Sequence, residues 1–111
     1  MSTPVTLRRL KYWFDRLNRE VFSGRCPEVT LEIGPKSNKQ WAETADRGGK
    51  LTIRWADGPA DQDLLKEVMA HEMVHCIVGV RAGHGGKFLA YRDLLKAHNI
   101  PLRRVICSKD S

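Results

Sequence analysis

The segment 61–79 constrains this chain more than any other part of the sequence. Its apolar residues recur at helical spacing, and in the helix that they predict they lie on nearly all sides. A helix of this kind is buried in a protein core. Its middle nonetheless carries the three polar residues His71, Glu72 and His75 in an H-E-x-x-H pattern. Polar groups inside a core need partners, so this segment predicts both the centre of the fold and a site.

The H-E-x-x-H pattern favours a zinc site. Four residues of helix advance about 400°, which places His71 and His75 one turn apart on one face. Two imidazoles so placed can share a tetrahedral zinc at about 2.0–2.1 Å from each nitrogen. Glu72 lies about 100° further round and is expected to act as the general base on a zinc-bound water. The alternative is a helix with two surface histidines and an ion-paired glutamate, which the apolar surroundings argue against.

A catalytic zinc needs a third protein ligand, because it keeps three ligands and one open position. The sequence offers few candidates for this role: His84, His98, Cys76, Cys107 and Asp93. We favour His84, since glycines on both sides free the backbone to fold back over the end of the helix. An exposed loop histidine is the other interpretation of this residue.

The remaining sequence predicts an α+β fold in a single domain, residues 1–111. We expect an N-terminal helix with Thr3 as its cap and Pro4 in its first turn, ending at Gly24. Asp61 or Asp63 is expected to cap the H-E-x-x-H helix, which would run to about residue 78.

Between these helices we expect a small, mainly antiparallel sheet. Three short strand-like runs have the required alternation: 29–33, 40–44 and 50–55. The link 46–49 is typical of a hairpin turn. The run that ends at Trp55 is a candidate edge to which an extended substrate could add as a further strand. The alternative is that Trp55 fills the core beneath the H-E-x-x-H helix.

After the glycine-rich loop 83–86, a C-terminal helix is expected over 87–98. The segment 102–107 is compatible with a last strand or a docked tail. With the N-terminal helix, the sheet and the H-E-x-x-H helix, this completes the expected order of a minimal zincin-like core.

The net charge and the cysteines narrow the expected partners and the expected cellular compartment. The formal net charge of +6 raises the expectation of weak, sequence-nonspecific DNA contact, although basic residues can also serve solubility alone. No apolar run is long enough for a membrane span, and no signal peptide is visible at the start. The cysteines are Cys26, Cys76 and Cys107, an odd number without a Cys-x-x-Cys pair. We therefore expect reduced thiols and a cytoplasmic location.

Four segments together resemble the SprT-like family, which is related to the DNA–protein crosslink protease Spartan. They are 14–22 (FDRLNREVF), 51–53 (LTI), 67–75 (EVMAHEMVH) and 83–88 (GHGGKF). The likeness extends over residues 7–100, and the combination of H-E-x-x-H with Gly-His-Gly-x-x-Phe is its most specific part. The resemblance implies a zinc peptidase core with His84 as third ligand and action on proteins bound to DNA. Many members of this family carry a cysteine-rich zinc ribbon after the core, and this sequence shows none, so we expect a minimal form without the ribbon.

The sequence therefore predicts a zinc-dependent endopeptidase that hydrolyses peptide bonds in a protein or peptide substrate through a metal-bound water. Its metal ligands would be His71, His75 and His84, and its general base Glu72. Two other functions remain open. One is a basic DNA-binding module with a structural zinc, in which Trp41 or Trp55 stacks on bases. The other is a zinc processing peptidase that has no role on DNA.

Overall fold

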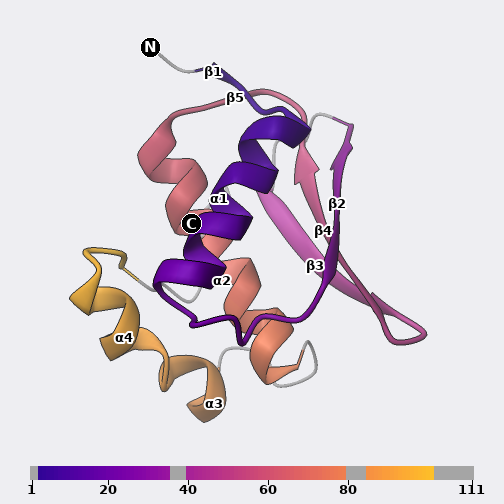
Figure 1. Ribbon diagram of the computed structural model, residues 1–111. Helices are drawn as coiled ribbons and strands as arrows, with labels where there is room; N and C mark the ends of the chain where they lie inside the picture. Colours follow the sequence, from indigo (N-terminus) through magenta and orange to yellow (C-terminus); the bar gives the residue numbers. More distant parts are fainter. Residues whose placement is uncertain (1–2, 36–39, 80–84, 102–111) are drawn as a thin grey trace.

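The computed structural model describes residues 3–35, 40–79 and 85–101, and the predicted α+β class is confirmed (Figure 1). Helices cover one face of a three-stranded sheet, and a two-stranded sheet closes one end. The elements in chain order are β1 (Thr3–Pro4), α1 (Leu7–Glu20), β2 (Val29–Gly34), β3 (Ala42–Arg47), β4 (Lys50–Ala56), β5 (Pro59–Ala60), α2 (Gln62–Val78), α3 (Gly86–Leu89) and α4 (Arg92–Ala97).

The three-stranded sheet has the order β2–β4–β3. The strands β3 and β4 form the predicted antiparallel hairpin, whose two linking residues Gly48 and Gly49 have φ of 63° and 91°. Positive φ at both positions suits the tight hairpin turns that follow the twist of the strands. The small β1–β5 pair is also antiparallel, whereas β2 runs parallel to β4. The described strand pairs are therefore mostly antiparallel, as expected.

The position of β4 corrects one expectation. This strand lies between β2 and β3, so its backbone is hydrogen-bonded on both sides and no substrate strand can add to it. Trp55, at the end of β4, is only 1% exposed and fills the core, which was the alternative reading. Within the described ranges, the outer strands of this sheet are β2 and β3.

Strand register decides which residues face the helices. Leu31 of β2, Ile53 of β4 and Thr44 of β3 lie in one row across the sheet. Ile53 is fully buried, so this row belongs to the face that the helices cover. The next row contains Glu32 and Arg54, whose charged groups approach to 4.0 Å on the other face. One apolar face and one polar face are what a two-layer fold requires.

The start of α1 differs from the prediction. The helix begins at Leu7, and the hydroxyl oxygen of Thr6 accepts a hydrogen bond from the backbone N–H of Arg9 at 3.2 Å. The predicted cap Thr3 and its neighbour Pro4 instead form β1, paired with β5. The Arg9 guanidinium holds this arrangement because it donates to the carbonyl groups of Thr3, Pro4 and Ala60 at 2.7–2.9 Å.

The predicted bounds of α2 are confirmed. Asp61 is its cap, accepting a hydrogen bond from the backbone N–H of Leu64 at 2.8 Å, and Gly79 ends the helix with φ of 101°. Buried residues follow one another along the helix from Val68 to Val74, so the expectation of a core helix is also confirmed.

The C-terminal part differs from the single helix expected over 87–98. Two short helices, α3 and α4, are separated at Ala90 and Tyr91, where the backbone makes a tighter hydrogen bond from Tyr91 to Phe88. The predicted strand or tail at 102–107 lies outside the described residues. None of the helices described is both long and apolar enough to cross a membrane.

Candidate metal centre

Helix α2 brings two of the predicted ligands together. The Nε2 atoms of His71 and His75 lie 3.3 Å apart. A tetrahedral zinc bound at about 2.05 Å from two nitrogens separates those nitrogens by about 3.3 Å. His71 is 1% exposed and His75 is half-buried, so the pair sits where the helix meets the rest of the core. The donors present and their spacing fit a zinc ion.

Phe88 of α3 packs against this histidine pair. Its ring centroid lies 4.8 Å from the centroid of His71 and also 4.8 Å from that of His75, and the side chain is fully buried. In Figure 1, α3 accordingly lies at the end of α2 where that helix finishes. The contact limits the rotation of both imidazoles, which keeps their nitrogens facing a common point. The sequence indicated Phe88 only as part of an apolar stripe.

The third predicted ligand, His84, lies outside the described residues. Within the ranges that the structure describes, no three histidine, cysteine or acidic side chains gather where they could hold a metal ion. The rival candidates in those ranges therefore do not join the pair. His98 is exposed at the end of α4, and Asp93 is exposed in the first turn of that helix.

The carboxylate of Glu72 points to the sheet. Its Oε2 atom accepts a hydrogen bond from the hydroxyl of Thr44 on β3, and that hydroxyl also lies 3.5 Å from the Glu72 backbone carbonyl oxygen. Glu72 is 2% exposed, so this partner offsets part of the cost of burying a carboxylate. Thr44 was not predicted as a site residue. The one signal for it was the alternation of the strand, which places polar Thr44 on the same inward face as Ala42, a core residue two positions earlier.

Cys76 belongs to the core, as expected, but it has an unforeseen neighbour. Contact with the thiol of Cys26 and burial raise the pKa of the Cys76 thiol, and the nearby charge of Glu72 acts in the same direction. Cys26 is held in place by Asn18, which accepts from its backbone N–H at 3.0 Å and donates to its carbonyl oxygen at 3.3 Å. Asn18 therefore fixes the loop after α1 to α1 itself, and the Cys26 thiol, which lies 4.0 Å from the Met73 carbonyl oxygen, connects this loop to the helix that carries the histidines.

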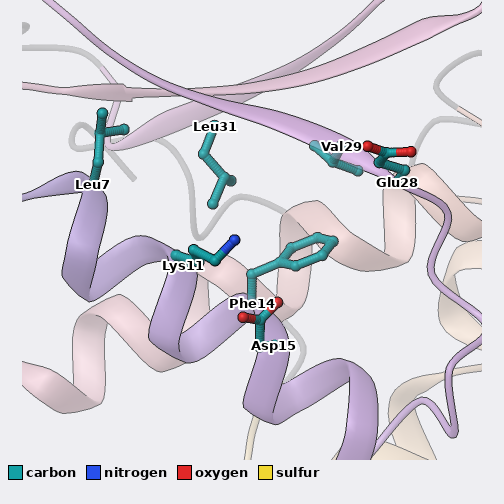
Figure 2. Close-up of a pocket in the computed structure, with 7 residues that line it drawn as sticks. All are labelled: Leu7, Lys11, Phe14, Asp15, Glu28, Val29 and Leu31. Atoms are coloured by element: carbon teal, nitrogen blue, oxygen red, sulfur yellow. The ribbon is translucent and has the colours of Figure 1, made fainter.

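A separate cavity of about 350 Å³ lies between α1 and β2 (Figure 2). Apolar side chains reach into it from both elements, and charged groups stand at its rim. Its lining consists of Leu7, Lys11, Phe14, Asp15, Glu28, Val29 and Leu31. None of the predicted site residues lines it, so the cavity is no part of the candidate metal centre.

Comparison with known proteins assigns neither a family nor a function to this chain. No model of a known protein family matches the chain, and a search of curated proteins finds no significant relative. The resemblance to the SprT-like family therefore rests on the motifs quoted above, and the function must be argued from the site itself.

Proposed function

We propose that this protein is a zinc-dependent endopeptidase. The observation that carries the proposal is the 3.3 Å separation of the His71 and His75 Nε2 atoms on a buried helix that also carries Glu72. A structural zinc site usually has four protein ligands and has no need of a buried glutamate beside them. This difference favours a hydrolase over a DNA-binding module with a structural zinc.

The proposed ligands are His71, His75 and His84. The sequence places His84 four positions before Phe88, whose ring contacts both described imidazoles, and this supports His84 over the exposed His98. Zinc held by three imidazoles would supply a water molecule of lowered pKa and a Lewis acid for the scissile carbonyl group.

Glu72 would act as the general base. Its carboxylate would take the proton of the attacking water and then deliver it to the nitrogen of the departing amine. Its place directly after His71 in the helix supports this role, because about 100° of rotation keeps it near the ligands without making it one of them. Burial from solvent strengthens every electrostatic interaction that the carboxylate makes.

The substrate would be an extended segment of a protein or peptide. Strand β3 is an outer strand of the sheet and contacts α2 through the pair Thr44 and Glu72. An extended chain that adds to the open side of β3 would therefore run past the proposed base. This replaces β4, which has no open side, as the strand that would bind substrate.

Two further parts of the proposal rest on composition. The net charge of +6 supports weak, sequence-independent contact with DNA, and with the family resemblance it supports action on DNA-bound proteins. Trp55 cannot serve as a stacking platform for bases, because it is buried. A cytoplasmic location is supported by Cys26 and Cys76, which are thiols rather than a disulfide.

Cleavage of unstructured casein by zinc-loaded protein tests the proposal. Glu72→Gln keeps the size and hydrogen bonding of the side chain but cannot accept a proton near pH 7, so it should retain zinc and lose at least about 100-fold in rate. Glu67→Gln, which changes a glutamate on the same helix, should cleave like the unaltered protein. Near-native cleavage by Glu72→Gln, or no cleavage by the zinc-loaded unaltered protein, would refute the assignment.

A further inference from the structure

The contact between Thr44 and Glu72 joins the outer strand β3 to the helix of the proposed metal centre. Thr44 is half-buried on β3, and its hydroxyl donates to Oε2 of the buried Glu72 carboxylate. A buried carboxylate with such a donor is held more firmly than one that faces water, because a hydrogen bond to a charged group is among the stronger ones.

The donor is itself held rigidly. Threonine is branched at Cβ, so its χ1 angle is restricted, and pairing of Thr44 with Ile53 of the inner strand fixes the backbone behind it. The hydroxyl has a single proton, which it donates to the carboxylate. The thiol of Cys76, one turn after Glu72 on α2, lies beside the same hydroxyl.

We propose that Thr44 is a positioning residue, whose hydroxyl holds the Glu72 carboxylate in the orientation needed for proton transfer. The inference rests on the proposed peptidase function. It adds a role for a residue of the sheet, outside the H-E-x-x-H helix, that acts through its hydrogen bond to Glu72. It also links substrate binding to catalysis, since Thr44 lies on the same strand that would accept the substrate.

Kinetics of zinc-loaded variants on a fluorogenic unstructured peptide give the first test. Thr44→Val has nearly the same shape but no hydroxyl, so kcat should fall at least about tenfold while KM changes less than about twofold. Thr44→Ser restores the hydroxyl and should recover most of the lost kcat. The matched control is Thr52→Val, which alters a buried threonine in the neighbouring row of β4 and should leave both constants unchanged.

A double-mutant cycle of Tm values, measured on the metal-free protein, gives a second test that needs no activity. The loss of Tm caused by Thr44→Val should at least halve in a Glu72→Ala background, because the partner of the hydroxyl is then gone. Equal losses in both backgrounds would overturn the inference, as would a native kcat in Thr44→Val or no rescue by Thr44→Ser. Failure of the zinc-loaded unaltered protein to cleave would instead overturn the peptidase function, and with it the catalytic role of Thr44. The double-mutant cycle of Tm values would still decide whether Thr44 holds the carboxylate.

Discussion

The Nε2 atoms of His71 and His75 lie 3.3 Å apart on one face of α2, with the ring of Phe88 packed against both imidazoles. This spacing is set by a single helical turn and matches one edge of a zinc tetrahedron. Two of the proposed ligands are thus arranged by local backbone geometry. The third depends on how the chain returns after the helix, which makes the role of His84 a question for mutation.

His84→Ala should weaken zinc binding far more than His98→Ala. Loss of an inner ligand should cost more than about 100-fold in affinity, because even changes in the outer shell cost about 10–100-fold. His98 is exposed at the end of α4, so its removal should leave the affinity within about twofold. Competition against a chromophoric chelator measures both constants. Equal losses in the two variants would remove His84 from the ligand set.

The raised pKa of the Cys76 thiol predicts a loss of stability at alkaline pH. The ordinary pKa is 9.0, so above this pH the unfolded chain loses the thiol proton while the native protein keeps it. Stability is therefore lost as pH rises. The Tm of the metal-free protein should fall more steeply between pH 9 and about pH 10 than that of Cys76→Ala. Parallel curves for the two proteins would show that the thiol ionises normally in the fold.

Removal of the α2 cap should destabilise the fold without touching the site. Asp61→Ala leaves the backbone N–H of Leu64 without its side-chain acceptor, which should cost about 1 kcal/mol in the free energy of unfolding. Asp63→Ala, in the first turn of the same helix, loses only a favourable charge near the helix N-terminus and should cost about 0.5 kcal/mol or less. Urea titration compares them, and equal costs would contradict the capping role.

The parts of the fold that the sequence could predict are those governed by local rules. The cap at Asp61, the stop at Gly79 and the Gly48–Gly49 hairpin each depend on residues a few positions apart. The parallel pairing of β2 with β4 depends on long-range packing and left no local pattern. The same holds for β1, because Thr3 and Pro4 are drawn into a sheet by a strand more than fifty residues away.

The site divides in the same way. The pairing of His71 with His75 follows from helical periodicity and could be predicted. The contact of Thr44 with Glu72 joins a strand to a helix, and no spacing within either element encodes it. The meeting of Cys26 with Cys76 is likewise a product of packing, since Cys26 lies in the loop after α1.

Binding to DNA should be weak and strongly dependent on salt. Contact with about three phosphates would lower the affinity for a labelled single strand about 20-fold between about 50 and 200 mM salt. Arg8 and Arg19 are exposed on α1, and changing both to glutamate should abolish the binding at the lower salt. Arg54→Glu, on the other face of the sheet, is the matched control. Absence of binding by the zinc-loaded protein at the lower salt would leave a peptidase with no role on DNA.

X-ray absorption at the zinc edge tests the central claim most directly. The zinc-loaded protein should show a nitrogen or oxygen shell at about 2.0–2.1 Å, with the outer scattering of three imidazoles and no sulfur shell. His71→Ala and His75→Ala should each lose one imidazole or fail to load zinc. A sulfur shell at about 2.3 Å, or fewer than two imidazoles in the unaltered protein, would contradict a centre built on His71 and His75.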